Sequence, residues 1–208
     1  MANLKHAIKQ GIVALKAKNI QPVMQTVGDE CLLKGKTALV VGGSGGIGKA
    51  VAKAFLKNGA NVVIAGTRRA KVDKVVLELG EKCAGVVVDL AEPETFSKVI
   101  DEAVAFYGPI DILVNSAGVH TEDVSMGGFL DFSVEEYDRI LDINLRGVYF
   151  MVQSVAKRMI SDKVSNGHIL IVSSSAGNEP AWSPYRVSKW GLKGITEGMA
   201  SALVPHGL

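Results

Sequence analysis

Residues 37–48 read TALVVGGSGGIG, and this stretch decides the fold. Its first five residues are apolar or β-branched, as expected of a buried strand, and the glycine-rich loop after them leads straight into an amphipathic stretch. A strand that passes through a glycine loop into a helix presents backbone N–H groups and the positive end of the helix dipole to an anion. The stretch therefore predicts a phosphate-binding turn in an α/β domain.

Short apolar runs alternate with amphipathic stretches along the rest of the chain. A strand that helices cover on both faces is apolar on successive residues. The runs that fit this description are 37–41, 61–65, 85–88, 111–114 and 168–172. The helical stretches between them carry boundary signals, such as a stop at Asn58-Gly59 and a capping box from Ser133 to Glu136. We therefore predict a Rossmann-type, doubly wound parallel sheet with helices on both faces.

The composition is that of a folded soluble domain. The chain has 208 residues, of which 48% are hydrophobic and 21% charged, and its formal net charge is +2. This charge is too near zero for a dedicated nucleic-acid or membrane-surface protein, and no apolar run reaches the roughly 18 residues that span a bilayer. Cys31 and Cys83 lie far apart and match no metal-ligand spacing, which favours a reducing cytoplasm. We expect a cytoplasmic protein without nucleic-acid, membrane or metal partners.

The first 35 residues differ from the rest and are expected to form a helical extension. Apolar residues recur there at helical spacing, at Leu4, Ile8, Ile12 and Leu15. Pro22 then interrupts the pattern. A mitochondrial transit peptide would be rich in arginine, and this stretch has none. We expect residues 1–35 to form an arm that packs on the domain or on a neighbouring subunit, and residues 36–208 to form the domain itself.

Two phosphate-binding motifs compete for the glycine loop. Residues 43–50 nearly match a P-loop, but that motif ends in a Ser or Thr that binds Mg²⁺, and Ala50 has no hydroxyl group. The spacing Gly42-x-x-x-Gly46-x-Gly48 fits a dinucleotide loop, in which small residues let a cofactor approach the backbone. The pattern favours the dinucleotide loop, while a purely structural turn stays open as a third interpretation.

The end of the second predicted strand indicates which dinucleotide binds. Folds that bind NAD usually carry Asp or Glu about 20 residues beyond the glycines, to bond the ribose 2′-OH group. Here the strand runs into Thr67, Arg68 and Arg69, with no acidic residue before Asp73. Guanidinium groups bind a 2′-phosphate through paired, charge-assisted hydrogen bonds, so we predict NADP(H). The alternative is that both arginines merely open a solvated helix.

A tyrosine–lysine pair and a serine cluster are the candidates for chemistry. Tyr185 and Lys189 are four residues apart, so on a helix they project from one face. A nearby cation lowers the pKa of a phenol, which prepares it to give or take a proton near neutrality. Residues 173–175 follow the last predicted strand, and ligands of open α/β sheets lie at the carboxyl ends of strands. Serine hydroxyls there can bond a carbonyl oxygen, although a serine-rich turn without chemistry fits as well.

Taken in order, these motifs resemble the short-chain dehydrogenase/reductase family, from about residue 36 to the C-terminus. The glycine loop is similar to the family's T-G-x-x-x-G-x-G, with Val41 in place of the Thr. Residues 115–118 resemble N-N-A-G, with Ser116 in place of the second Asn. Four further positions match the family's catalytic tetrad: Asn144, Ser174, Tyr185 and Lys189.

The resemblance implies a role for each member of this tetrad. Tyr185 would be the general acid in carbonyl reduction, or the base in alcohol oxidation, and Lys189 would lower its pKa and hold the nicotinamide ribose. Ser174 would polarise the substrate oxygen, and Asn144 would organise a water chain to Lys189. The cofactor contacts expected from the loop, the arginines and the resemblance are Gly42, Ser44, Gly46, Ile47, Gly48, Thr67, Arg68, Arg69, Asp89, Leu90, Asn115, Ala117, Gly118, Tyr185 and Lys189.

The resemblance implies an NADP(H)-dependent oxidoreductase that interconverts a carbonyl group and a secondary alcohol. Within the family, the pattern most resembles 3-oxoacyl-thioester (acyl-carrier-protein) reductases, which implies an acyl thioester as substrate. The alternative is a non-catalytic dinucleotide-binding or assembly protein that retains the fold, and the intact tetrad argues against it. Glu179, Pro180 and Trp182 are candidates for substrate contacts, whereas His120 fits no role.

Two further expectations concern assembly and the end of the chain. Gly191, Gly194 and Gly198 share one face of the Tyr185 helix, and glycines there make sense if another helix approaches closely. We therefore expect a homodimer or homotetramer. The family continues with further strands beyond Leu208. We thus expect a truncated or partly processed form that lacks the C-terminal strands, so that the strand at 168–172 is a sheet edge with an uncovered apolar flank. Such a form should bind cofactor weakly and turn over poorly, if at all.

Overall fold

The computed structural model describes residues 32–120 and 129–208 of the protein. The helical extension predicted for residues 1–35 therefore lies outside the described residues, apart from 32–35, which form a turn. The same holds for residues 121–128, which follow one of the candidate site loops.

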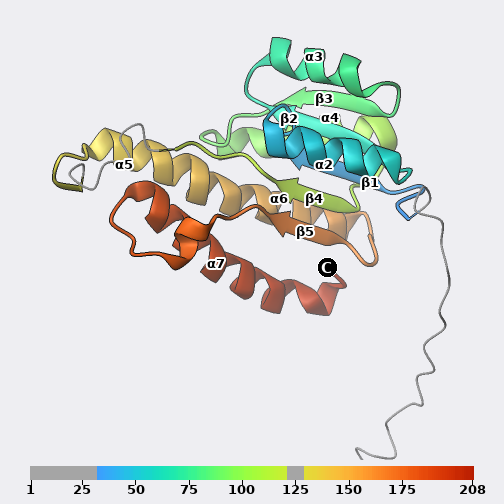
Figure 1. Ribbon diagram of the computed structural model, residues 1–208. Coiled ribbons are helices and arrows are strands. Elements are labelled where there is room, and N and C mark those ends of the chain that lie inside the picture. The colour runs from blue at the N-terminus through green and yellow to red at the C-terminus, as the bar shows by residue number, and fades with distance from the viewer. Residues whose placement is uncertain (1–31, 121–128) are drawn as a thin grey trace, which may run out of the picture.

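One parallel sheet of five strands forms the centre of the described domain (Figure 1). Its strands are β1 (Thr37–Val41), β2 (Asn61–Gly66), β3 (Cys83–Val87), β4 (Ile112–Asn115) and β5 (His168–Ile171). Every neighbouring pair runs parallel, in the order β3-β2-β1-β4-β5. The predicted Rossmann-type α/β class is confirmed, and each predicted strand agrees with the structure to within about two residues.

Helices cover both faces of this sheet. The main helices are α2 (Gly46–Lys57), α3 (Arg69–Leu79), α4 (Phe96–Tyr107), α5 (Val134–Leu141), α6 (Val148–Ser161) and α7 (Pro184–Leu203). A π-helical turn, η4 (Asp142–Gly147), joins α5 to α6, and short 3-10 turns are η2 (Pro93–Thr95), η5 (Ser175–Asn178) and η6 (Val204–His206). None of the described helices is both long and apolar enough to cross a membrane.

The alternation of side chains along the strands divides the core into two layers. Ala38 and Val40 of β1 face α2 and α3, whereas Leu39 and Val41 face α4, α6 and Leu192 of α7. In Figure 1, α2 accordingly lies on one side of the sheet and α6 on the other. Because both faces of β1 are covered, all five of its residues are buried, which is why its sequence is apolar without interruption.

The strand order reverses between β1 and β4, and this positions the site. The chain winds from β1 outward to β3, then returns to place β4 on the other side of β1. The connections that leave the carboxyl ends of β1 and β4 therefore diverge, which opens a crevice at that edge of the sheet. Both the glycine loop and residues 115–118 leave the sheet at this point.

β5 is the edge strand expected of a sheet without further C-terminal strands, although its sequence is apolar on successive residues like that of a strand covered on both faces. Its burial alternates, and Leu170 is 48% exposed. Among the described strands, β5 pairs only with β4. It is thus the edge strand of the described sheet, and one of its faces is open.

Cys83 provides a test of the packed sheet. It is 5% exposed at the start of β3, and burial raises the pKa of its thiol to about 11. We predict that, in a Cys31→Ser variant, a thiol reagent at pH 8 modifies Cys83 at least about 100-fold more slowly in native buffer than in denaturant, because the thiolate is the reactive form. Mass spectrometry over time measures both rates. Equal rates would show that β3 is not packed as described.

Candidate functional site

Two glycines let the backbone close up where β1 leads into α2. Gly42 has a positive φ of +80°, and a Cβ atom there would lie 2.6 Å from the backbone nitrogen of Ala117. A Cβ on Gly48 would lie 2.6 Å from Oγ of Ser116 and would also collide with the Gly42 carbonyl. The loops after β1 and β4 are therefore in direct contact, and α2 lies close against both.

The N-terminus of α2 presents free backbone N–H groups at the turn where the sequence predicts an anion. Gly45 caps the helix without any side-chain bond, and no acidic residue lies in the first turn. The first N–H groups of a helix have no acceptor within the helix and carry a partial positive charge. The turn before the helix is held by a hydrogen bond from Gly45 N to the Gly42 carbonyl, at 2.9 Å. This arrangement fits a pyrophosphate.

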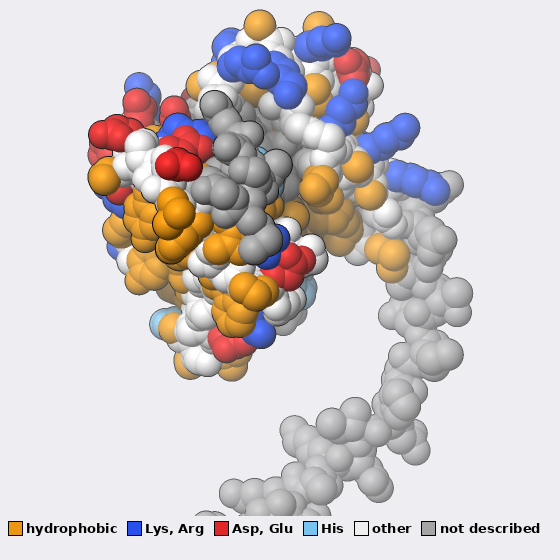
Figure 2. All heavy atoms as spheres, turned by 60° about the vertical axis from the view of Figure 1, so that its left-hand side comes forward, with side chains coloured by type: hydrophobic (Ala, Val, Ile, Leu, Met, Phe, Trp, Pro, Cys, Tyr) orange, Lys and Arg blue, Asp and Glu red, His pale blue; other side chains and the backbone are white. Residues whose placement is uncertain are grey.

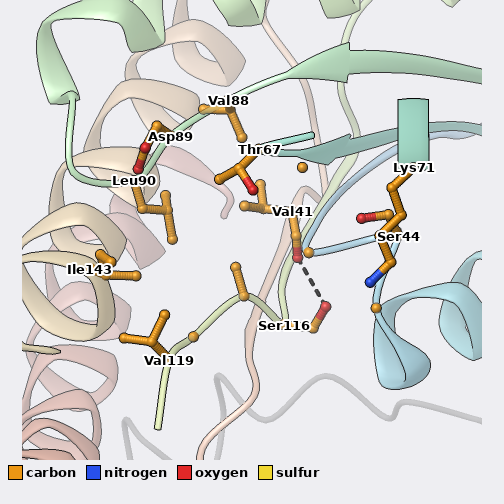
Figure 3. Close-up of a pocket in the computed structure, with 15 residues that line it drawn as sticks. Val41, Ser44, Thr67, Lys71, Val88, Asp89, Leu90, Ser116, Val119 and Ile143 are labelled. Carbon is orange, nitrogen blue, oxygen red and sulfur yellow. Dashed lines mark hydrogen bonds between the residues drawn. The ribbon is translucent and has the colours of Figure 1, made fainter. Parts of the chain in front are cut away.

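A pocket extends from this turn along the carboxyl ends of the strands (Figure 3). Of the predicted cofactor contacts, the lining includes Gly42, Ser44, Thr67, Asp89, Leu90, Ala117 and Gly118. The remaining predicted contacts do not line it: Gly46, Ile47, Gly48, Arg68, Arg69, Asn115, Tyr185 and Lys189. Ser116, which departs from the family pattern, donates a hydrogen bond to the Val41 carbonyl at 2.9 Å and ties the two loops together.

The cation in this pocket is Lys71 rather than either predicted arginine. Its side chain extends beside Ser44 (Figure 3). Arg68 is the N-cap residue of α3, and Arg69 forms an ion pair with Asp73 at 2.9 Å. Lys71 was not among the predicted contacts, because those were placed directly after β2. The sequence signal for it is a lysine in the first turn of the helix that follows β2.

Asn144 connects three segments around the end of the pocket. It is fully buried in η4, and its side chain accepts a hydrogen bond from Val119 N at 2.7 Å and donates one to the Val119 carbonyl at 2.8 Å. Its amide also donates to Oγ of Ser188, at 3.3 Å, and Ser188 donates in turn to the Tyr185 carbonyl, at 2.7 Å. The loop after β4, the π turn and α7 are therefore fixed relative to one another.

Lys189 is buried next to this network. Its side chain donates to the Val172 carbonyl at 3.4 Å, and its Nζ lies 5.4 Å from the centre of the Tyr185 ring. Burial lowers the pKa of Lys189, because the charged form loses solvation. An ideal Cβ on Gly118 would lie 3.7 Å from Nζ of Lys189 and 3.1 Å from Oδ1 of Asn144. Gly118 also lines the pocket, so the pocket and the lysine meet at this residue.

His120 lies against the proposed catalytic tyrosine, although it fits no motif in the sequence. The centres of the His120 and Tyr185 rings are 4.1 Å apart, and the ring planes are inclined by 36°. Arg139 donates to the His120 carbonyl at 3.2 Å, which holds the backbone there. Because the contact joins residues 65 positions apart in the chain, only the folded arrangement reveals it.

Ser174 begins the turn that carries the chain from β5 to α7. Its Oγ accepts a hydrogen bond from Ala176 N at 3.2 Å and caps η5. A Cβ on Gly177 would lie 2.9 Å from the Lys189 carbonyl, so this turn packs directly on the backbone of α7. The structure thus places Ser174 in a turn that rests on the helix of Tyr185 and Lys189.

The buried amide of Asn115 marks a further polar position at the crevice. It is 1% exposed at the end of β4, and neither its nitrogen nor its oxygen has a hydrogen-bond partner within the described part of the chain. Buried polar groups are nearly always satisfied. Asn115 directly precedes residues 116–118, which line the pocket, although its own side chain is not part of the lining.

Known proteins are similar to this chain over most of its length. The family described as short chain dehydrogenase matches residues 36–208. The chain is 35% identical over 182 residues to Oxidoreductase UcpA of Escherichia coli (strain K12), which amounts to 85% of this chain and 66% of that protein. It is 35% identical over 181 residues to Dehydrogenase/reductase SDR family member 4 of Homo sapiens, 85% of this chain and 63% of the relative. The chain thus spans just under two thirds of these curated relatives.

The fold comparison agrees. A crystal structure of a short-chain type dehydrogenase/reductase from Mycobacterium marinum is similar to this chain with a TM-score of 0.77 and 32% sequence identity. The match covers 85% of this chain and 72% of that one.

Two glycine variants test the close packing of the turn before α2. A Cβ on Gly48 would collide with Gly42, whereas a Cβ on Gly46 meets no atom of the described residues within 4 Å. We predict that Gly48→Ala lowers the free energy of unfolding by about 1–3 kcal/mol, while Gly46→Ala changes it by less than about 0.5 kcal/mol. Urea unfolding followed by circular dichroism measures both. Equal losses in the two variants would contradict the described contact.

Proposed function

The chain belongs to the short-chain dehydrogenase family, and from this premise we propose that it is an NADP(H)-dependent oxidoreductase that interconverts a ketone and a secondary alcohol. The observation that carries the proposal is the meeting point at Gly118. This residue lines the dinucleotide-type pocket and lies beside both Asn144 and Lys189. A cofactor in the pocket would therefore end next to the buried lysine and the tyrosine that it faces.

The residues at this point can deliver a proton to a carbonyl oxygen. When bound, the nicotinamide dinucleotide supplies a hydride to the carbonyl carbon. The Tyr185 hydroxyl gives its proton to the oxygen, so that the carbonyl group gains the two hydrogens of an alcohol. Ser174 donates a hydrogen bond to the same oxygen and stabilises the negative charge that develops there. In the direction of oxidation, Tyr185 takes the proton back.

Lys189 is suited to return a proton to Tyr185. Its lowered pKa means that its ammonium group gives up a proton more readily than an exposed lysine does. Asn144 holds the backbone around Nζ in place through its two hydrogen bonds to Val119. Asn144 is a positioning residue in this scheme, because it acts through the loop and not on the substrate.

Basic groups near the outer end of the pocket support NADP(H). Lys71 lines the pocket beside Thr67, and no carboxylate follows β2 before Asp73. Figure 2 shows Lys and Arg side chains gathered over the top of the molecule, where α3 lies in Figure 1. We propose that Lys71, with Arg68 at the start of α3, binds the 2′-phosphate.

The substrate class and the assembly complete the proposal. We propose that the substrates are 3-oxoacyl thioesters, because the motifs resemble those of 3-oxoacyl-thioester reductases. We also propose that the protein acts as a homodimer or homotetramer in the cytoplasm. A Cβ atom on Gly194 or Gly198 of α7 would meet no atom of the described residues within 4 Å. This supports the approach of a partner helix at that face. Gly191 has a different reason, because a Cβ there would lie 2.7 Å from the Leu145 side chain within the same chain.

The tyrosine provides the direct test of catalysis. We predict that Tyr185→Phe lowers kcat by about 10²–10⁴-fold, since it removes only the hydroxyl that transfers the proton. The Kd for NADPH should change by less than about threefold, because the ring remains. NADPH absorbance with a panel of ketones and acetoacetyl thioesters measures turnover. A protein that binds NADPH but reduces nothing would favour the non-catalytic alternative, and near-native kcat in Tyr185→Phe would contradict the assigned role.

Lysine variants test the cofactor proposal. We predict that NADPH binds about 10–100-fold more tightly than NADH, and that Lys71→Gln weakens NADPH binding by about tenfold without changing the Kd for NADH. Lys74→Gln is the matched control, since Lys74 is an exposed cation of the same helix that does not line the pocket. Fluorescence titration of both reduced cofactors into the wild type and the two variants measures the six dissociation constants. Equal loss of NADPH and NADH binding in Lys71→Gln would contradict 2′-phosphate recognition.

A further inference from the structure

The segment of residues 175–183 joins the two hydroxyl groups of the proposed reaction. It starts directly after Ser174 with η5, and it ends where Ser183 caps α7 by accepting a hydrogen bond from Arg186 N at 3.3 Å. Ser174 and Tyr185 must reach the same carbonyl oxygen. The path of this segment therefore sets how the two hydroxyls lie relative to each other.

Arg186 fastens the middle of the segment to α7. Its Nη1 forms an ion pair with Oε2 of Glu179 at 2.6 Å and donates to the Pro180 carbonyl at 3.4 Å. The guanidinium carbon also lies 5.1 Å from the centre of the Trp182 ring, within the range of a cation–π contact. One side chain thus holds three positions of the segment.

Trp190 provides a second attachment one turn further along α7. Its indole Nε1 donates to the Glu179 carbonyl at 2.7 Å. This bond goes to the backbone of Glu179, so it is separate from the ion pair that the Glu179 side chain makes with Arg186. Gly177 lies against the Lys189 carbonyl just before this point. The segment is therefore attached to α7 at successive places along its length.

The two residues that attach the segment have the same spacing along α7 as the tyrosine and lysine of the proposed reaction. Arg186 and Trp190 are four residues apart, and each follows one member of the Tyr185–Lys189 pair by a single position. Two adjacent rows of the same helix therefore hold the proposed reacting groups and the attachments of the segment. Any shift of the segment along α7 would move Ser174 relative to Tyr185.

From these contacts, we propose that Arg186 and Trp190 are positioning residues, which fasten the segment of residues 175–183 to α7 and so hold Ser174 in place opposite Tyr185. Glu179, Pro180 and Trp182, predicted from the sequence as candidates for substrate contacts, are then the attachment points of this segment. The inference rests on the proposed function, because the hydroxyl that these residues position takes part in the proposed reaction.

Turnover in three variants of the full chain tests the proposal. Trp190→Phe removes the hydrogen bond but keeps an aromatic ring, Arg186→Gln removes the charge, and Glu179→Gln weakens the ion pair without touching the Trp190 bond. We expect kcat to fall by about tenfold in Trp190→Phe and Arg186→Gln, with less than about threefold change in the Kd for NADPH. Glu179→Gln should lower kcat by a smaller factor. Lys193→Gln, an exposed cation of the same helix, should behave as wild type.

A double-mutant cycle shows whether the attachments act through Ser174. In a Ser174→Ala background, Trp190→Phe should lower kcat by less than about twofold, because the hydroxyl that it positions is already absent. A full tenfold loss in that background would overturn the proposal. So would kcat within twofold of wild type in both Trp190→Phe and Arg186→Gln.

Fluorescence reports the attachments independently of activity. The two tryptophans of the chain, Trp182 and Trp190, both belong to this cluster. In Trp190→Phe, emission therefore comes from Trp182 alone, and adding Arg186→Gln should increase its quenching by acrylamide. Unchanged quenching would overturn the attachment. The proposed function itself would be overturned if the wild-type chain showed no turnover, or if Tyr185→Phe left turnover intact. Acrylamide quenching would still show in that case whether the segment is attached to α7.

Discussion

The buried amide of Asn144 is the constraint on which the arrangement of the site depends. Its oxygen and nitrogen pair with both backbone groups of Val119, and its nitrogen also reaches Ser188 on α7. Separating the three segments would break these bonds, and each buried group left unsatisfied would cost about 1–3 kcal/mol. A buried polar network of this kind specifies one arrangement, whereas apolar contacts at the same place would tolerate several.

The π turn that carries Asn144 also sets the other end of the pocket. A Cβ on Gly147, the last residue of η4, would lie 2.8 Å from Cβ of Leu90 and would collide with the Leu90 carbonyl. Leu90 lines the pocket next to Asp89. One irregular turn therefore positions a wall of the pocket through its last residue, Gly147, and the surroundings of Lys189 through Asn144. Irregular helical turns of this type occur frequently at functional sites.

The sequence predicts those features that depend on local patterns, and it misses those that depend on where side chains meet. The strands from Thr37–Val41 to His168–Ile171 and the glycine turn follow from apolar runs and glycine spacing, so they could be predicted closely. The π turn could not, because residues 142–147 carry an ordinary helical pattern. Lys71 and the contact of His120 with Tyr185 likewise depend on the direction of side chains in the folded chain. The open face of β5 depends on which elements cover it, so it follows from the expected lack of the family's C-terminal strands and not from the apolar pattern of residues 168–172.

Helix α7 explains why the proposed chemistry and its supports lie together. The helical repeat of 3.6 residues gives this helix separate rows of side chains. One row carries Tyr185 and Lys189, the next holds the segment of residues 175–183 through Arg186 and Trp190, and a third begins at Ser188 and enters the core at Leu192. The core row anchors the helix against the sheet, so the other two rows hold their positions relative to the strand ends. A change in any row would therefore be transmitted to the others through a rigid element, which makes the orientation of α7 the link between packing and chemistry.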